Sequence, residues 1–322
     1  MITTESIQFT GPYKLEFVSK RLPDLLPHQI LVKTLACGIC QREIQVYNGY
    51  ENNRYPDIMG HEPVGIVQKI GEKVQNVSVG DIVSTMGDHC LSRYYIADDE
   101  FSHKVVNGNN EDILGFLGEP VMCAVNALRW SGLQPGSNVV VVGCGFMGTL
   151  LIQGLSHSLT NNIIVLDING NAKMRALTNG ADYFFTVNDS IQEYISKTFG
   201  KENIDLVFEA SGSLSGLEIA TRLVRHGGTI CMYGHQTTNK FFSFDQWHFK
   251  GLRILNTVPW ISNNLSREFR DGVNLLNKGY FNTSSLISHY FEFSDAKIAF
   301  EVANNHPENY VKGVICFSGG CV

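Results

Sequence analysis

The chain has 322 residues, a length that at about 100–200 residues per domain indicates two domains or one large α/β domain. Hydrophobic residues make up 43% and charged residues 17%, which excludes a disordered chain, and no apolar run reaches the length of a membrane span. The net charge of -6 and the lack of a dense basic cluster argue against a nucleic-acid-binding protein. We therefore expect a globular protein with no nucleic-acid and no membrane partner.

The N-terminal residues 1–5 lack the basic start and apolar core of a secretion signal, so we expect a cytoplasmic protein whose cysteines form no disulfides. The cysteines are then buried small side chains, metal ligands or nucleophiles, and their spacing has to distinguish these roles. There are eight of them: Cys37, Cys40, Cys90, Cys123, Cys144, Cys231, Cys316 and Cys321.

Two kinds of pattern follow one another along the chain. Residues 1–116 contain short apolar segments separated by turn residues, which predicts a mostly β region. After residue 119, continuous apolar segments alternate with helix-length segments, which predicts a doubly wound parallel sheet covered by helices on both faces. The predicted strands of this sheet are 138–142, 163–167, 183–186, 205–209, 229–233 and, as a candidate sixth, 253–256.

The last part of the chain, from about residue 256, is predicted to form a helix, a strand, a second helix and a final strand. The sequence predicts a helix from an N-cap at Ser294 to about Asn304 and a final strand at 311–317. This part has no apparent core of its own, so we expect that it returns to the first domain.

A glycine-rich turn follows the first strand of the predicted parallel sheet. Residues 143–148 read Gly-Cys-Gly-Phe-Met-Gly, the G-x-G-x-x-G spacing of a dinucleotide-binding turn. The spacing alone also fits an ordinary strand-to-helix turn. The strand before the turn and the helix-competent segment after it, 149–155, favour the dinucleotide site.

Each position of this turn has a physical reason. Gly143 permits the tight turn, Gly145 lets the backbone approach the pyrophosphate, and Gly148 lets helix and strand pack closely. The start of the helix, with Phe146 and Met147, then presents free backbone N–H groups to the phosphates.

Asp167 ends the second of these strands, 24 residues after Gly143, where a carboxylate accepts hydrogen bonds from the adenosine ribose. Its charge would repel a 2′-phosphate and no arginine follows immediately, so we expect NAD rather than NADP as the cofactor. Lys173 and Arg175 leave NADP open as an alternative.

From the residues of metal-binding type in the first 119 positions we assemble four into one candidate site: Cys40, His61, Glu62 and Glu119. A catalytic zinc needs three protein ligands, which can be far apart in the sequence. The spacing does not prove a site, because each residue also fits a structural role as a buried thiol, a turn histidine, or a surface or capping carboxylate.

Several motifs occur in the order found in zinc-dependent medium-chain alcohol and polyol dehydrogenases, and the resemblance extends over nearly the whole chain. It is most similar to the sorbitol and threonine dehydrogenase branch, because Glu119 and Pro120 stand where other alcohol dehydrogenases carry a cysteine ligand. The motifs are Gly38-Ile39-Cys40, Gly60-His61-Glu62, Glu119-Pro120, the glycine turn and 208–212.

The resemblance implies an α/β fold and a role for each candidate residue. A GroES-like, mostly β catalytic domain would comprise 1–119 and 257–322, and a Rossmann NAD-binding domain 120–256. Cys40 and His61 would be zinc ligands, and Glu62 would lie at or near the metal and exchange with water. Glu119 would bind zinc directly or through a water, and Glu43 would orient the ring of His61.

Two positions depart from the family pattern. Arg42 replaces the serine or threonine that relays the substrate proton in related proteins, and Gln45 replaces a downstream histidine. Arginine is a poor general base because its pKa exceeds about 12, so the usual relay is in doubt. Arg42 suggests instead an anchor for a phosphate or carboxylate of the substrate, or a structural ion pair with Glu43 or another carboxylate.

Most of the other cysteines are expected to be structural. Cys37 and Cys40 have the C-x-x-C spacing of a redox pair, but no second such pair and no thioredoxin-like context accompany it. We therefore expect Cys37 to pack in the interior or to lie next to the metal ligands. Related proteins often carry a four-cysteine zinc lobe where this chain has only Cys90, so one catalytic zinc and no structural zinc are expected. Cys123 could border the nicotinamide pocket.

The resemblance implies an oxidoreductase, an NAD-dependent zinc alcohol or polyol dehydrogenase. It would transfer hydride between NAD and a secondary alcohol or ketone of a polyol, cyclitol or sugar-like substrate, with anionic substrates included. A homodimer or homotetramer is expected, as is usual in this family. Two alternatives stay open: a zinc-free quinone or enone reductase of the same fold, and an NAD-binding protein that has lost the chemistry, which the Arg42 and Gln45 replacements would favour.

Overall fold

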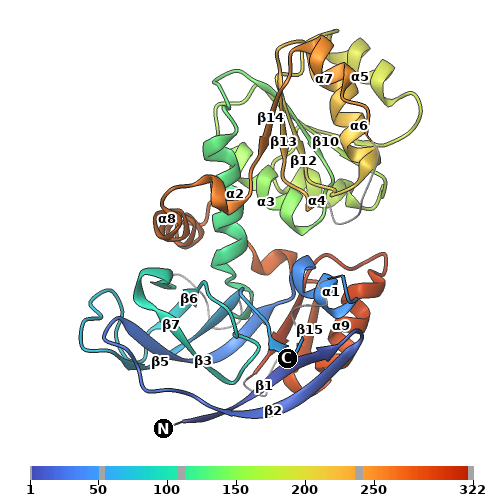
Figure 1. Cartoon of the computed structure of the whole chain (residues 1–322). Coiled ribbons are helices and arrows are strands. Elements are labelled where there is room, and N and C mark those ends of the chain that lie inside the picture. The colour runs from blue at the N-terminus through green and yellow to red at the C-terminus, as the bar shows by residue number, and fades with distance from the viewer. Residues whose placement is uncertain (1, 51–54, 107–112, 236–241, 318–322) are drawn as a thin grey trace. The chain divides into compact units, whose positions relative to one another are not determined.

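The computed structural model describes residues 2–50, 55–106, 113–235 and 242–317. The chain divides into two compact units (Figure 1): unit 1 comprises Met1–Met122 and Ser266–Val322, and unit 2 comprises Cys123–Leu265. The first division lies three residues beyond the predicted domain limit at 119, and the second lies nine residues beyond the limit at 256.

Unit 2 is built on a six-stranded parallel sheet with the strand order β11-β10-β9-β12-β13-β14. This order is that of a doubly wound dinucleotide-binding fold, so the predicted Rossmann-type α/β sheet is confirmed. The candidate sixth strand is β14. The strands are β9 (Asn138–Val142), β10 (Asn162–Asp167), β11 (Tyr183–Thr186), β12 (Leu206–Glu209), β13 (Thr229–Met232) and β14 (Arg253–Asn256).

Helices cover both faces of this sheet, with α3 on the opposite face from α5 and α6 (Figure 1). The cover is needed because the central strands are apolar on both faces, and every residue of β9 is buried. Val140 and Ile164 of the sheet pack in one cluster with Leu217 of α6. The helices are α3 (Phe146–Ser156), α4 (Ala172–Thr178), α5 (Ile191–Phe199), α6 (Leu214–Leu223) and α7 (Asp245–Lys250).

Unit 1 contains two sheets, and its core strand is β3 (Gln29–Gly38). A small antiparallel sheet consists of β1 (Thr3–Gly11), β2 (Lys14–Arg21) and β4 (Asp57–Ile58). The larger sheet has the order β15-β16-β3-β5-β6-β8, and β7 also pairs with β3. Its other strands are β5 (Pro63–Ile70), β6 (Ile82–Thr85), β7 (Tyr94–Asp98), β8 (Ser102–Lys104), β15 (His289–Glu292) and β16 (Gly313–Cys316).

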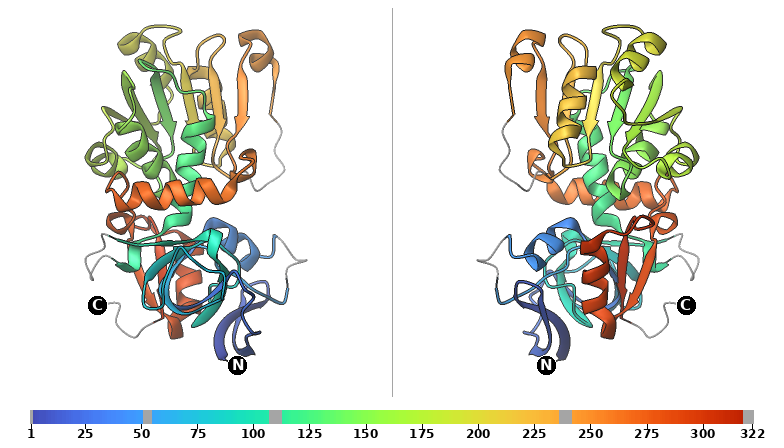
Figure 2. Two further views of the ribbon diagram at one scale, coloured as in Figure 1. Left: turned by 90° about the vertical axis from the view of Figure 1, so that its left-hand side faces the viewer. Right: turned by 90° about the vertical axis from the view of Figure 1, so that its right-hand side faces the viewer.

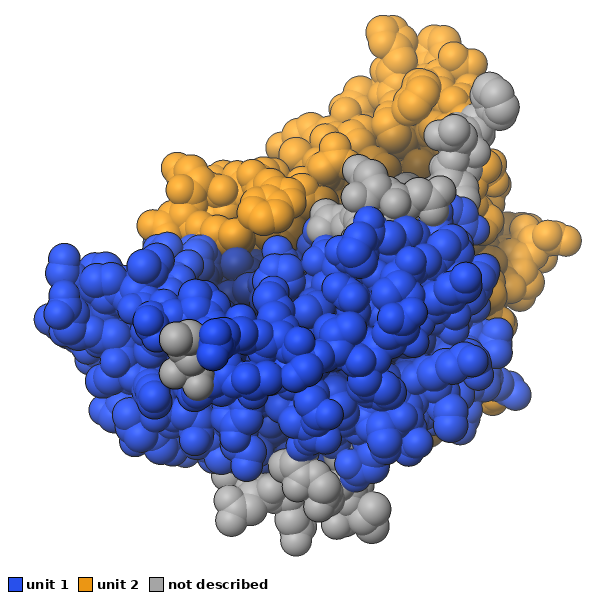
Figure 3. Space-filling view, turned by 60° about the horizontal axis from the view of Figure 1, so that its bottom comes forward, with its two compact units in different colours: residues 1–122, 266–322 blue, residues 123–265 orange. Residues whose placement is uncertain are grey.

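The C-terminal part of the chain completes unit 1. Strand β16 pairs antiparallel with β3, so that Val314 lies opposite Gly38. Phe300 of α9 packs edge-on against Phe9 of β1, with ring centroids 5.1 Å apart. Figure 2 shows these red C-terminal elements beside the blue N-terminal strands, and Figure 3 gives the described residues of both chain segments of unit 1 the same colour. The remaining helices are α1 (Gln41–Tyr47), α2 (Gly118–Trp130), α8 (Leu265–Asn277) and α9 (Ala296–Asn305).

Two local expectations are wrong. Helix α9 has its N-cap at Asp295 rather than Ser294, because Phe293–Asp295 form a 3-10 turn that leads into the helix. Cys316 is disulfide-bonded, whereas the other six described cysteines are free. The expectation of no disulfide rested on the redox compartment, but a disulfide also depends on two thiols folding within bonding distance, which composition does not reveal.

Three strand ends meet at one place in unit 1. Strand β3 is antiparallel to both β5 and β16, so the end of β3 lies beside the beginnings of the other two. The backbone N–H of Gly38 donates to the carbonyl of Glu62 at 3.0 Å, and the N–H of Ile39 donates to that of Gly313 at 2.9 Å. This junction holds the residues immediately after β3 close to those immediately before β5 and β16.

Candidate metal centre and cofactor turn

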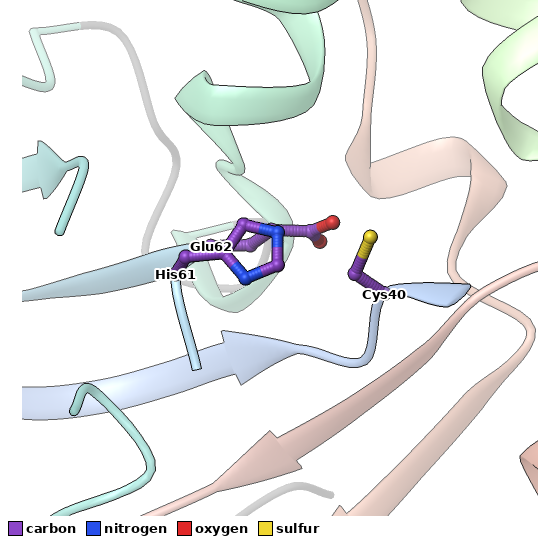
Figure 4. Close-up of side chains that lie close together, drawn as sticks. All are labelled: Cys40, His61 and Glu62. Carbon is purple, nitrogen blue, oxygen red and sulfur yellow. The ribbon is translucent and has the colours of Figure 1, made fainter. Parts of the chain in front are cut away.

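Cys40, His61 and Glu62 converge at this junction. Their ligand atoms all lie within 4.8 Å of one another, and the three side chains point toward a common point (Figure 4). Cys40 follows β3 as the N-cap of α1, while His61 and Glu62 directly precede β5. Within the described ranges this is the one group of three or more potential metal ligands.

Glu43 fixes the geometry of two members of the group. Its Oε2 accepts a hydrogen bond from the backbone N–H of Cys40 at 3.0 Å, and its Oε1 lies 2.6 Å from Nδ1 of His61. The Glu43 side chain is 1% exposed, so these contacts satisfy a buried carboxylate. With Nδ1 of His61 engaged, Nε2 is the ring nitrogen that is available to a metal.

The charges of these groups depend on one another. Burial lowers the pKa of His61, but the Glu43 and Cys40 charges outweigh this and raise it well above its usual range. Burial raises the pKa of the Cys40 thiol, partly offset by His61. Burial also acts to raise the pKa of Glu43, but His61 and Lys312 bring it below its ordinary value. Metal binding would therefore displace protons from Cys40 and His61.

The donor set fits zinc. A thiolate, an imidazole and a carboxylate are the ligand types of catalytic zinc sites, and three protein ligands leave a fourth position for water or substrate. The buried Glu43 contact to the imidazole is the kind of outer-shell hydrogen bond that such sites use.

Lys312 is a neighbour of the group that the sequence did not reveal. Its Nζ lies 2.5 Å from Oε2 of Glu62, with both side chains almost fully buried. Burial lowers the pKa of Lys312, but the charges of Glu62 and Cys40 outweigh this and raise it above its ordinary value. The available signal was a single lysine at the beginning of an apolar strand, between Val311 and Gly313-Val314.

Two other predicted site residues, one for the metal and one for the substrate, lie outside the compact group. Glu119, the second residue of α2, is half-buried and is not among the three converging ligands. Arg42, the second residue of α1, is half-buried and forms no ion pair or hydrogen bond in the part of the chain that the structure describes. Its immediate neighbour Glu43 is instead engaged by His61 and the backbone of Cys40.

The predicted cofactor turn lies in unit 2, between β9 and α3. Gly143 adopts a φ of 98°, which favours glycine. A Cβ on Gly148 would overlap the carbonyl oxygen of Gly143, whereas a Cβ on Gly145 would have no atom within 4 Å. Phe146 is buried, so its available contribution to a ligand is its backbone N–H, which like that of Met147 lies in the first turn of α3.

Asp167 is held in place beside this turn. Its Oδ2 accepts a hydrogen bond from the N–H of Cys144 at 2.6 Å, and its Oδ1 accepts one from the N–H of Asn169 at 2.8 Å. Arg175 donates from Nε and Nη2 to the carbonyl of Cys144, at 3.0 and 2.6 Å. The guanidinium thus braces the glycine turn, and Lys173 is exposed on α4.

We expect the substitution Glu43→Gln to weaken zinc binding by about 10–100-fold, because the amide replaces one oxygen of a carboxylate that accepts from both Cys40 and His61. Competition with a chelator of known affinity measures this change. Glu301→Gln, at an exposed position of α9, is the control. Unchanged zinc affinity in Glu43→Gln would contradict the orienting role.

A parallel sheet with a G-x-G-x-x-G turn, together with a Cys-His-Glu group in a second unit, defines a zinc-type dehydrogenase. Comparison with known protein families gives the same class of protein. Residues 26–149 match the alcohol dehydrogenase GroES-like domain, and residues 147–278 match the zinc-binding dehydrogenase domain. The chain belongs to the zinc-dependent medium-chain alcohol dehydrogenase family, in its polyol dehydrogenase branch, as the motifs predicted.

Individual relatives cover almost the whole chain. D-xylulose reductase of Saccharomyces cerevisiae is 25% identical, with 98% of each chain covered. D-arabitol-phosphate dehydrogenase of Enterococcus avium is 24% identical, with 92% of each covered. The crystal structure of L-idonate 5-dehydrogenase from Escherichia coli superposes with a TM-score of 0.85 at 18% identity, over 98% of this chain and 99% of that one.

The chain is accordingly an enzyme of the zinc-type alcohol and polyol dehydrogenase family. Among the helices that the structure describes, none has both the length and the apolar character needed to cross a membrane.

Proposed function

We propose that this enzyme uses one zinc ion and NAD to interconvert a secondary alcohol and the corresponding ketone of a polyol, cyclitol or sugar-like substrate. The observation that carries the proposal is the convergence of Cys40, His61 and Glu62 within 4.8 Å in a chain that also has a dinucleotide turn. A zinc-free quinone or enone reductase would have no use for such a group.

In this mechanism the chain's own residues hold and orient the reacting groups. Cys40 and His61 would hold the zinc together with a carboxylate from Glu62 or Glu119, and Glu43 fixes the ring of His61. Zinc, when bound, would polarise the substrate oxygen and lower its pKa, which favours loss of the hydroxyl proton near neutral pH. An arginine side chain is a poor general base, so we do not assign the uptake of that proton to Arg42.

The cofactor we infer is NAD rather than NADP. Asp167 is anchored by Cys144 and Asn169, so its negative charge stays at the end of β10, where it would bind ribose hydroxyls and repel a 2′-phosphate. Arg175, the nearest candidate to bind such a phosphate, is engaged by the carbonyl of Cys144. This cofactor, when bound, would supply the hydride-transfer chemistry of the reaction.

The decisive experiment measures metal content and dehydrogenase activity on the same preparation. We expect about one zinc per chain, and NAD-dependent oxidation at alkaline pH of at least one member of a panel of polyols, polyol phosphates and cyclitols, with NADP less effective. Zinc-free protein that shows no activity would overturn the proposal. Tight NAD binding without turnover would favour a protein that has lost the chemistry.

The substrate class we favour includes an anionic group, bound by Arg42. This guanidinium lies two residues after Cys40, is half-buried, and has no carboxylate partner among the described residues. Such a group can bind a phosphate or carboxylate with two parallel hydrogen bonds. The similarity to an enzyme named for a polyol phosphate supports the same substrate class.

We expect Arg42→Ala to raise KM for a phosphorylated polyol by about 10–100-fold, since a hydrogen bond to a charged group contributes about 1.5–3 kcal/mol. KM for the unphosphorylated polyol should change little. Arg42→Lys retains the charge but loses the paired hydrogen-bond geometry. Its KM for the phosphorylated polyol should lie between the KM of the unchanged enzyme and that of Arg42→Ala. Equal effects on both substrates, or an effect on kcat alone, would contradict the anchoring role.

A further inference from the structure

A buried ion pair joins the metal group to the last strand of unit 1. Nζ of Lys312 and Oε2 of Glu62 are 2.5 Å apart, and the exposed fractions of the two side chains are 6% and 2%. Among the described residues Oε2 accepts no other hydrogen bond. The ammonium is therefore the partner that compensates the charge of this oxygen.

The surroundings leave the pair little room to rearrange. A Cβ on Gly38 would overlap Oε2 of Glu62 and would lie 2.9 Å from Cδ1 of Leu117 and 3.1 Å from Cε of Lys312. The hydrogen bonds from Gly38 to Glu62 and from Ile39 to Gly313 fix the three backbone segments that form this pocket. Glu62 and Lys312 thus meet in a closed space that only a glycine at position 38 permits.

The pairing has a consequence for the metal. A carboxylate that is already bound to a buried ammonium has to give up part of that interaction before it binds a cation, and separating a buried pair is costly. Glu43, in contrast, supports the other two members of the group as ligands, because it contacts Nδ1 of His61 and accepts from the backbone N–H of Cys40. Among the three described ligands, Glu62 is the one that forms a direct ion pair with a buried ammonium.

We propose that Lys312 is a positioning residue that competes with the metal for the carboxylate of Glu62. Lys312 holds the carboxylate of Glu62 away from the metal for most of the time, so that a coordination position stays open for substrate while Cys40 and His61 remain bound. The inference rests on the proposed zinc site, and it assigns to Lys312 a function beyond that of a structural counter-ion.

The test uses the full-length protein loaded with Co²⁺, whose visible absorption spectrum reports on the ligands. In the otherwise unchanged chain, Glu62→Gln should leave the spectrum nearly the same. Lys312→Met should alter the spectrum, because Glu62 then becomes a permanent ligand, and should tighten zinc binding by about 10–100-fold, the range of outer-shell effects. Adding Glu62→Gln to Lys312→Met should restore the original spectrum.

The outcomes separate this inference from the proposed function. If Glu62→Gln changes the Co²⁺ spectrum equally in the unchanged chain and in Lys312→Met, Lys312 does not control Glu62. The inference is then wrong, while the zinc site stands. If the unchanged chain binds no Co²⁺ or Zn²⁺, both are wrong. The single variant Glu62→Gln decides the matter even if Lys312→Met does not fold, because a large spectral change in it would show that Glu62 is already a permanent ligand.

Lys312→Arg is the matched control. It retains the buried positive charge, so its Co²⁺ spectrum should resemble that of the unchanged chain. A merely structural role for Lys312 would alter the thermal stability in Lys312→Met without a Glu62-dependent change of spectrum.

Discussion

Replacing Cys40 by serine should remove the bound zinc and lower kcat/KM by about a thousandfold or more, since a catalytic metal contributes several kcal/mol to transition-state stabilisation. The hydroxyl of serine is a much weaker ligand for zinc than a thiolate. Cys40 is the N-cap of α1, where serine is a favoured residue, so the variant should keep its fold. Metal analysis measures the zinc content, far-UV circular dichroism the retained fold and steady-state kinetics the change in kcat/KM, all on one preparation.

Cys90→Ser provides the control for this experiment. Cys90 is buried in the same unit, and its Sγ donates to the carbonyls of Gly87 and Asp88 at 3.5 and 3.6 Å, which a serine hydroxyl can also do. This variant should retain its zinc and its activity. If Cys40→Ser retains normal zinc content and rate, Cys40 is not a ligand of the catalytic metal.

The second large effect is expected at the glycine turn, where two substitutions of the same size should act differently. Gly148→Ala places a Cβ against the backbone of Gly143, which cannot yield without distorting the turn. We expect a loss of about 1–3 kcal/mol in the free energy of unfolding, as for other overpacked sites, together with loss of NAD binding. Thermal unfolding and calorimetric titration with NAD measure the two quantities.

Gly145→Ala should leave the protein without NAD as stable as the original, because Gly145 has a φ of -73° and a Cβ there meets no atom within 4 Å. NAD binding should nevertheless be strongly weakened, because the methyl group occupies the space through which the pyrophosphate approaches the backbone. Normal NAD affinity in Gly145→Ala would contradict the assignment of this turn to the cofactor.

The fold of unit 2 was predictable because its strands are buried on both faces and therefore appear as uninterrupted apolar runs. The run 138–142 coincides with β9, and 163–167 lies within β10. In unit 1, polar residues and register shifts interrupt the apolar pattern of β3, so the apolar segment 30–33 accounts for less than half of this strand, which extends from Gln29 to Gly38. The order of strands in its sheets follows from no local pattern.

The candidate site likewise contains residues that local sequence patterns predict and one residue that they do not. Cys40, His61 and Glu62 were named from motifs, each of which is local in the sequence. Lys312 was missed because it lies 250 residues beyond Glu62, and only the pairing of β16 with β3 brings the two together. A lone lysine is uninformative until that pairing is known.

The discontinuity of unit 1 has a consequence for the order in which the protein acquires its parts during synthesis. Unit 2 is continuous in the chain and is fully synthesised before β16, whereas β3 cannot pair with β16 until some 275 residues have followed it. Domains tend to fold as units during translation, and pairings between distant segments form slowly. We therefore expect a nascent chain that can bind nucleotide before it can complete its metal centre, although Cys40 and His61 are synthesised first.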